Sequence, residues 1–197
     1  MADLINDFPI PTVCEILDTI KALSSYKSKI YFAGMEAEYS FGFSDACTHK
    51  QIEGLEKSLG RSLPEDYKQF LIYTNGLDLP TGISSSRLCS LREIRQIMSI
   101  FNWFPSDFLP IGMCADGTIC VTINLSEQGR QNIYIIDVMA DECFRRLNCD
   151  FRTFLDRFIA TYGNAFWEWG AVSTNIKQSA QKNVDSTLLK GMLWFYQ

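Results

Sequence analysis

Two amphipathic helices predicted between Thr48 and Gly76 constrain the fold more than any other feature of the sequence. The first begins with a capping box, because Thr48 is followed three positions later by Gln51. Its apolar residues share one helical face: Ile52, Leu55 and Leu59. The second begins around Pro64 and ends at Asn75-Gly76, with a buried side formed by Tyr67, Phe70 and Leu71. Two helices joined in this way predict a compact helical hairpin.

Three further helices are predicted from similar start signals. Thr12 with Glu15, and Ser90 with Glu93, repeat the capping-box spacing. Asp150 precedes a run of apolar residues at helical spacing that reaches about Ile159. Each run places its apolar residues on one side, so each helix is expected to pack against a shared core.

Strands are predicted where apolar residues alternate with polar ones or gather in β-branched runs. The segment from Met35 to Phe43 alternates with period two, which is typical of an amphipathic strand. Thr118 to Leu125 and Ile133 to Val138 form two β-rich runs joined by a polar link that suits a hairpin. Helices and strands do not alternate strictly, which argues against a parallel doubly wound sheet. The predicted class is α+β, with a mainly antiparallel sheet packed against helices.

The charge balance bears on the kind of partner. The chain has 197 residues, 18 Lys and Arg, 23 Asp and Glu, and a formal net charge of −5. Its basic residues are scattered, so it lacks the clustered cations that bind nucleic acid. An acidic surface suits a basic protein partner, although the same charge also serves solubility alone. A protein partner is therefore expected, and neither nucleic acid nor membrane is.

Catalytic and metal-binding signals are weak. Seven cysteines are present without a C-x-x-C pair, and His49 is the single histidine, so no zinc site is expected. His49 falls in the first turn of a predicted helix, where an exposed role is the default, and no cysteine has a nucleophile context. No phosphate loop, dinucleotide motif or G-x-S-x-G appears. With no secretory signal at Met1 to Pro11, a cytoplasmic protein without cofactor or catalytic residues is expected.

The order of residues in the helical hairpin resembles the SUKH superfamily, the Smi/Knr-like proteins. The resemblance lies in the runs Ile52 to Gly60 and Leu63 to Leu71, and in Asn75-Gly76. Its signature residues are Leu63, Pro64, Tyr67, Phe70, Asn75 and Gly76, and their spacing is that of packing and capping positions. Phe108 to Gly112, Asp116-Gly117 and Ile133 to Asp137 match later parts of the family pattern. The loop from Met113 to Thr118 lacks most of the glycines that the family often has there.

The resemblance implies an α+β domain that works through protein–protein contacts. Bacterial members resemble immunity proteins that neutralise polymorphic toxins, many of them nucleases, and a fungal relative regulates cell-wall glucan synthesis. Three parts of the chain are expected: an N-terminal helix-and-strand extension packed on the core at 1–47, a SUKH-like domain at 48–163, and a C-terminal extension at 164–197. An immunity protein is the first hypothesis, and a regulator or scaffold of wall synthesis is the alternative. The partner would be a toxin domain with a basic surface.

Five residues are candidates for partner binding. Asp78 follows the Asn75-Gly76 turn, Trp103 lies in a predicted loop, and Asp116 is the acidic residue of the loop after Ile111. Exposed aromatic residues are frequent interface hot spots, although packing of Trp103 against its own core is slightly favoured. Glu53 and Glu56 belong to the polar side of the first hairpin helix, where a solvated face is the simplest explanation.

Overall fold

The computed structural model describes residues 11–25, 28–32, 35–39, 41–79, 86–101, 104–127, 131–138 and 143–168. The chain divides into two compact units, Met1–Asn164 and Ala165–Gln197. Among the described residues, the second unit contributes one short 3₁₀ turn, η2 (Phe166–Glu168). All other elements belong to the first unit.

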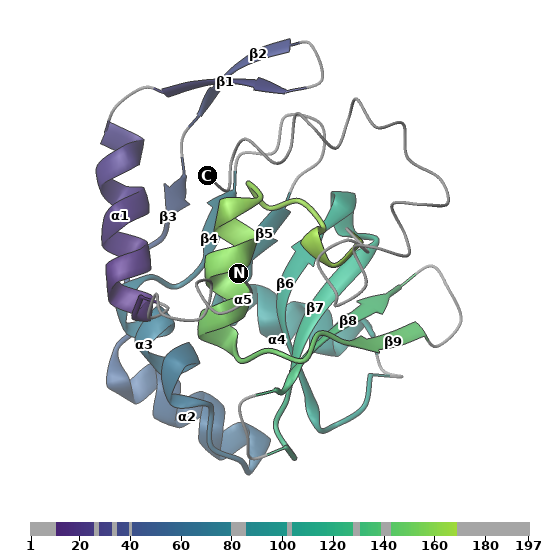
Figure 1. Ribbon diagram of the computed structural model, residues 1–197. Helices are drawn as coiled ribbons and strands as arrows, with labels where there is room; N and C mark the ends of the chain where they lie inside the picture. Colours follow the sequence, from purple (N-terminus) through teal and green to yellow (C-terminus); the bar gives the residue numbers. More distant parts are fainter. Residues whose placement is uncertain are drawn as a thin grey trace, which may run out of the picture. The chain divides into compact units, whose positions relative to one another are not determined.

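A seven-stranded antiparallel sheet forms the centre of the first unit (Figure 1). Its strands pair in chain order, so the sheet is a meander interrupted by helices. Its members are β3 (Gly42–Phe43), β4 (Leu77–Leu79), β5 (Ser86–Leu88), β6 (Phe108–Cys114), β7 (Ile119–Asn124), β8 (Ile133–Asp137) and β9 (Cys143–Arg146). A separate hairpin pairs β1 (Ser28–Phe32) with β2 (Met35–Tyr39). The predicted α+β class with an antiparallel sheet is confirmed.

Five helices accompany the sheet in the described part of the chain. They are α1 (Val13–Ser25), α2 (His49–Leu59), α3 (Glu65–Tyr73), α4 (Leu91–Ile100) and α5 (Phe151–Ala160). The capping boxes predicted at Thr48 and Ser90 are both present, and Asp150 accepts the N–H of Thr153 at the start of α5. Thr12 and Glu15 make the same reciprocal bonds before α1. All five helices therefore begin where their sequence signals placed them, α3 directly after Pro64.

Helices lie on both faces of the sheet. In Figure 1, α5 lies in front of the strands and α4 lies behind them, and α1, α3 and α5 contact one another. The central strand β7 is buried at five of its six positions, from Cys120 to Asn124, so both of its faces are covered. At the β4–β5 end one face is open, where Asp78 and Arg87 are exposed.

Aromatic side chains join the helical hairpin to the last helix. Tyr67, Phe70 and Phe151 are fully buried, and the ring centroid of Phe151 lies 5.0 Å from Tyr67 and 5.4 Å from Phe70. Burying a side chain of this size contributes about 1.5–3 kcal/mol. Asp66 adds a polar link, since one carboxylate oxygen accepts the backbone N–H of Arg152 in the first turn of α5.

One strand prediction is wrong in its extent. The alternating segment from Met35 to Phe43 does not form a single strand, because β2 pairs only with β1 and β3 pairs with β4 in the other sheet. Alternation reports a two-sided strand but not its partner, so a chain that passes from one sheet to another keeps the same pattern. Residues 169–197, which make up most of the expected C-terminal extension, lie outside the described part.

Candidate functional site

An open pocket of about 390 Å³ lies on the uncovered face of β4 and β5, beside the first two turns of α4. Four separate segments line it: Ser44, then Gly76 to Asp78, then Arg87 and Leu88, then Ser90, Arg92, Glu93 and Gln96. Its size is within the range of small-ligand and peptide side-chain sites. Since strands and a capped helix form its walls, the pocket is presented by rigid elements.

The turn from Thr74 to Gly76 leads into β4, and its last residue, Gly76, lines the pocket. The amide oxygen of Asn75 accepts the backbone N–H of Leu91 at 2.8 Å, which fixes the start of α4. Gly76 has φ +115°, and a Cβ there would lie 3.2 Å from both the Leu88 carbonyl oxygen and the Ser90 nitrogen. A larger residue at position 76 would therefore separate β4 from the β5–α4 connection.

Two charged residues of the pocket pair with each other, and two have no charged partner in the described part of the chain. Arg87 donates to Glu93 at 3.1 Å, and the other oxygen of Glu93 accepts the Ser90 N–H in the capping box. Asp78 faces Arg87 across the strands, yet it forms no ion pair with any described residue. Arg92 likewise has no carboxylate partner among them. One anion on a strand and one cation on a helix thus remain open to a partner.

Cysteine and histidine offer little reactive chemistry in the described residues. Burial raises the pKa of the Cys89, Cys114 and Cys149 thiols to about 12, and it also raises the pKa of Cys47 and Cys120. Thiols with such pKa values stay protonated near neutral pH and are poor nucleophiles. Cys14, Cys47, Cys89, Cys114, Cys120 and Cys149 are free thiols, and His49 is exposed in the first turn of α2.

The described residues contain neither a candidate metal site nor a helix that could span a membrane. They contain no group of three or more His, Cys, Asp or Glu side chains placed to hold a metal ion. No described helix has the length and apolar character needed to span a bilayer.

The model of the SMI1/KNR4 family (SUKH-1) matches residues 46–157, more than half of the chain. The chain belongs to this family. The uncharacterized protein YnaB of Bacillus subtilis (strain 168) is 28% identical over 140 residues, which are 71% of this chain and 92% of YnaB. The uncharacterized protein YobM of the same organism is 29% identical over 143 residues, 67% of this chain and 76% of YobM. The SUKH-1 match spans the helical hairpin, all pocket-lining residues except Ser44, and most of α5.

The signature residues of the SUKH-1 segment have structural roles in this chain. Leu63, Tyr67 and Phe70 are buried, and Pro64 is the N-cap of α3. The Tyr67 hydroxyl is buried, with no hydrogen-bond partner among the described residues. Asn75 was expected only to end the second helix, but its bond to α4 is a long-range role that local spacing does not reveal.

The predicted partner-binding residues lie on different elements. Asp78 lines the pocket, whereas Glu53 is exposed on α2. Glu56, also on α2, accepts the Leu63 N–H at 2.8 Å and lies 3.8 Å from the Lys68 ammonium, so it stabilises the hairpin. Trp103 lies outside the described residues. Arg92 was not among the predicted residues, because an exposed arginine on a helix looks like any solvated position.

Asp116 is exposed in the turn between β6 and β7, in a strained backbone. Ala115 has φ +49° and Asp116 has φ +55°, so two successive residues with a Cβ adopt the left-handed region. Such conformations cost about 1–2 kcal/mol per residue, and aspartate tolerates them better than alanine. This turn is a second exposed acidic position, separate in the chain from the pocket.

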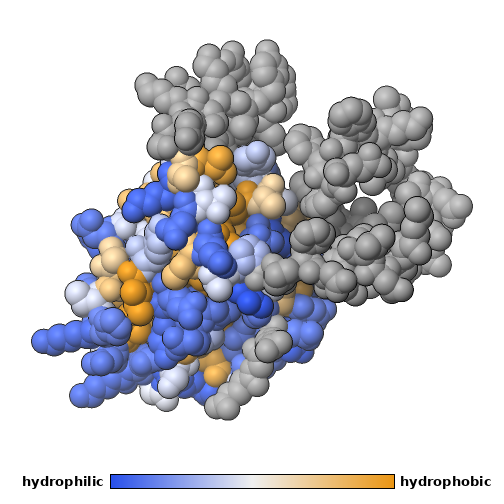
Figure 2. Space-filling model, turned by 60° about the vertical axis from the view of Figure 1, so that its left-hand side comes forward, coloured by the Kyte–Doolittle hydropathy of each residue, from blue (hydrophilic) through white to orange (hydrophobic). Residues whose placement is uncertain are grey.

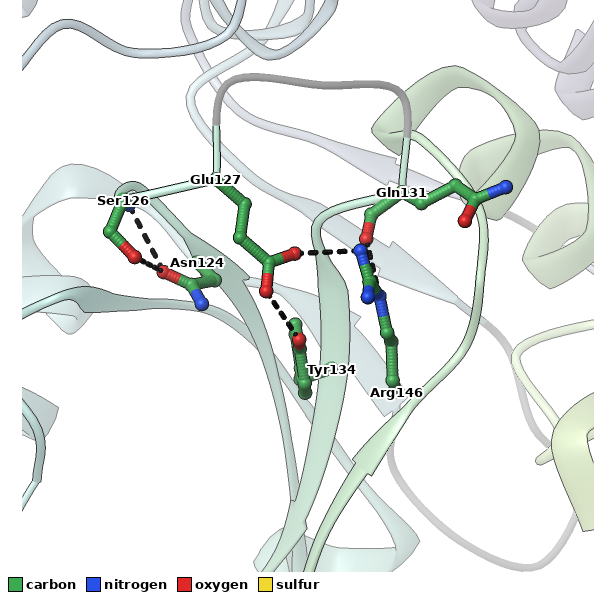
Figure 3. A network of polar contacts seen from close by, with 6 residues as sticks. All are labelled: Asn124, Ser126, Glu127, Gln131, Tyr134 and Arg146. Atoms are coloured by element: carbon green, nitrogen blue, oxygen red, sulfur yellow. Dashed lines mark hydrogen bonds and ion pairs between the residues drawn. The ribbon is translucent and has the colours of Figure 1, made fainter.

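A second polar cluster, at the β7–β8–β9 end of the sheet, satisfies itself (Figure 3). Glu127 accepts from the Tyr134 hydroxyl at 2.7 Å and from Arg146 at 2.9 Å. Arg146 also donates to the Gln131 carbonyl at 2.9 Å. Because its charges are paired internally, we interpret this cluster as a clamp between strands, in contrast with the open charges of the pocket.

The surface around α1 and α3 is mainly polar. Figure 2 shows that hydrophilic residues dominate this face of the described chain and that hydrophobic residues form small, separate patches. Leu23 on α1 and Ile72 on α3 are the exposed large hydrophobic residues of these two helices, at 50% and 40% exposure. Scattered residues of this kind are normal on a monomer and do not indicate a broad apolar interface.

Proposed function

We propose that the chain is a non-enzymatic immunity protein, which binds a polymorphic toxin and neutralises it. One observation carries the proposal: a SUKH-1 domain presents an open polar pocket whose Asp78 and Arg92 have no charged partner within the described part of the chain. Unpaired charges held on rigid elements favour recognition of a complementary protein surface. We take 48–163 as the binding domain and 1–47 and 164–197 as extensions.

Binding explains the pocket better than chemistry does. Arg87 and Glu93 make an ion pair, and Glu93 also takes part in the capping box of α4. These contacts are fixed, and they do not place a base beside a nucleophile. Cys89 is buried next to the pocket, and its thiol is protonated because burial raises its pKa to about 12. We place the protein in the cytoplasm, where such free thiols remain reduced.

The proposal is tested with the toxin domain encoded next to the gene of this chain. Co-expression is expected to give a stable complex and to protect cells that produce the toxin. A chain truncated within α5 serves as an unfolded control and is expected to give neither. If no neighbouring toxin candidate binds or is neutralised, the proposal is wrong. Sensitivity of a deletion strain to wall stress rather than to toxin would favour the regulator of wall synthesis.

A further inference from the structure

The pocket holds two open charges of opposite sign on different walls. Asp78 lies on β4, and its neighbour across the strands on one side is Gly42. A Cβ at Gly42 would lie 3.1 Å from both the Cβ and a carboxylate oxygen of Asp78, so glycine leaves the room that this side chain occupies. Arg92 lies on the outer side of α4 and also lines the pocket.

The ion pair between these walls leaves both charges available. Arg87 is the residue opposite Asp78 in the strand register, but its guanidinium donates to Glu93. Glu93 is held in turn by the Ser90 N–H and hydroxyl, both at 2.8 Å. Arg87 and Glu93 therefore form a fixed, nearly neutral pair, while Asp78 on β4 and Arg92 on α4 have no charged partner among the described residues.

This arrangement discriminates between partner segments by charge. A purely basic segment would satisfy Asp78 but bring like charges together at Arg92, and a purely acidic segment would do the reverse. Charges that lose water without a partner are costly, whereas complementary ones are not. We infer that the pocket receives a protruding segment of the partner protein that carries one basic and one acidic side chain, the basic group on Asp78 and the carboxylate on Arg92.

The inference rests on the proposed function for the identity of the partner, but not for the chemistry of the segment. A volume of about 390 Å³ accommodates a few side chains rather than a whole surface. The segment is therefore short, and its two charged residues lie close together in its chain.

Short peptides test the chemistry without a toxin. Blocked peptides with one Lys and one Glu, separated by zero to three Ala and in both orders, are titrated into the full-length ¹⁵N-labelled chain. At least one is expected to shift the amide resonances of Gly76, Asp78 and Ser90 and to bind about tenfold more tightly than its all-Lys and all-Glu analogues. Asp78→Asn and Arg92→Gln should each abolish that preference. The inference is overturned if no mixed peptide shifts these resonances, or if the like-charged analogues bind equally well.

The toxin complex gives the second test. Asp78→Asn and Arg92→Gln are each expected to weaken toxin binding about tenfold or more, measured by calorimetry. Arg95→Gln, which lies on α4 outside the pocket lining, is the matched control and should bind as the wild type does. The exchange Asp78→Arg with Arg92→Asp keeps the net charge and should still lose binding.

The outcomes separate the two proposals. A toxin bound equally by the pocket variants, or lost only with Arg95→Gln, would overturn the pocket inference and leave the immunity function standing. If no toxin is bound by the wild type, the immunity function fails, and the peptide titration decides whether the pocket selects mixed charge.

Discussion

Replacing Gly76 by alanine tests the close packing of this residue against Leu88 and Ser90 at the pocket. At φ +115° a residue with a Cβ is strained, which costs about 1–3 kcal/mol. The new Cβ would also lie 3.2 Å from two backbone atoms, one on Leu88 and one on Ser90, which cannot move aside as a flexible side chain can. Overpacking of this kind adds roughly 1 kcal/mol or more. We expect a total loss of about 3 kcal/mol in the free energy of unfolding.

The assay is urea and thermal unfolding of the full-length variant beside a second glycine variant. A loss of about 3 kcal/mol lowers the melting temperature by roughly 6–12 °C in a domain of this size. Gly54 lies within α2 with nothing within 4 Å of an added Cβ, so Gly54→Ala should stabilise the chain by about 0.5–1 kcal/mol. The reasoning is refuted if Gly76→Ala melts at or above the wild type while Gly54→Ala behaves as expected.

Four other substitutions have expected signs, each read by urea unfolding. Tyr67→Phe should leave the free energy of unfolding unchanged or raise it by up to about 1–3 kcal/mol, because the buried hydroxyl has no partner among the described residues. Tyr134→Phe loses the 2.7 Å bond to Glu127 and should lower the free energy of unfolding by about 0.5–1.5 kcal/mol. Ala115→Gly should stabilise the β6–β7 turn by about 1 kcal/mol, and a destabilised variant would contradict the left-handed backbone there. Burial raises the pKa of Asp66, so its contribution to stability is full below about pH 3.9 and is lost as the pH rises through the folded-state pKa. The stability of the wild type relative to Asp66→Asn should therefore fall between pH 4 and pH 7, and a rise would contradict the raised pKa.

Local signals predicted the helices well. A capping box joins residues three apart, so Thr48 with Gln51 and Ser90 with Glu93 are readable without tertiary structure. The β7–β8 hairpin was also predicted, because both strands are long enough to show their apolar runs. By contrast, β4 and β5 have three residues each, and three residues carry no recognisable period.

The pocket was not predicted from the sequence, because it is assembled from segments far apart in the chain. Asp78 was a candidate from its place after the Asn75-Gly76 turn, whereas Arg92 carried no signal of its own. Arg92 is distinguished by its place in the pocket beside β4 and β5 and by having no charged partner among the described residues. Both properties depend on the fold. The bond from Asn75 to Leu91 spans sixteen residues and was invisible for the same reason.

The most direct test of a binding mechanism is a titration of purified toxin activity with this chain. A protein that neutralises by occupying its target removes activity in proportion to the amount added, and the activity should reach zero near one chain per toxin. Unfolding the complex and removing the chain should then return active toxin after refolding. Complete loss of toxin activity at a small fraction of equimolar chain, increasing with time and not reversed by separation, would show turnover and contradict the account.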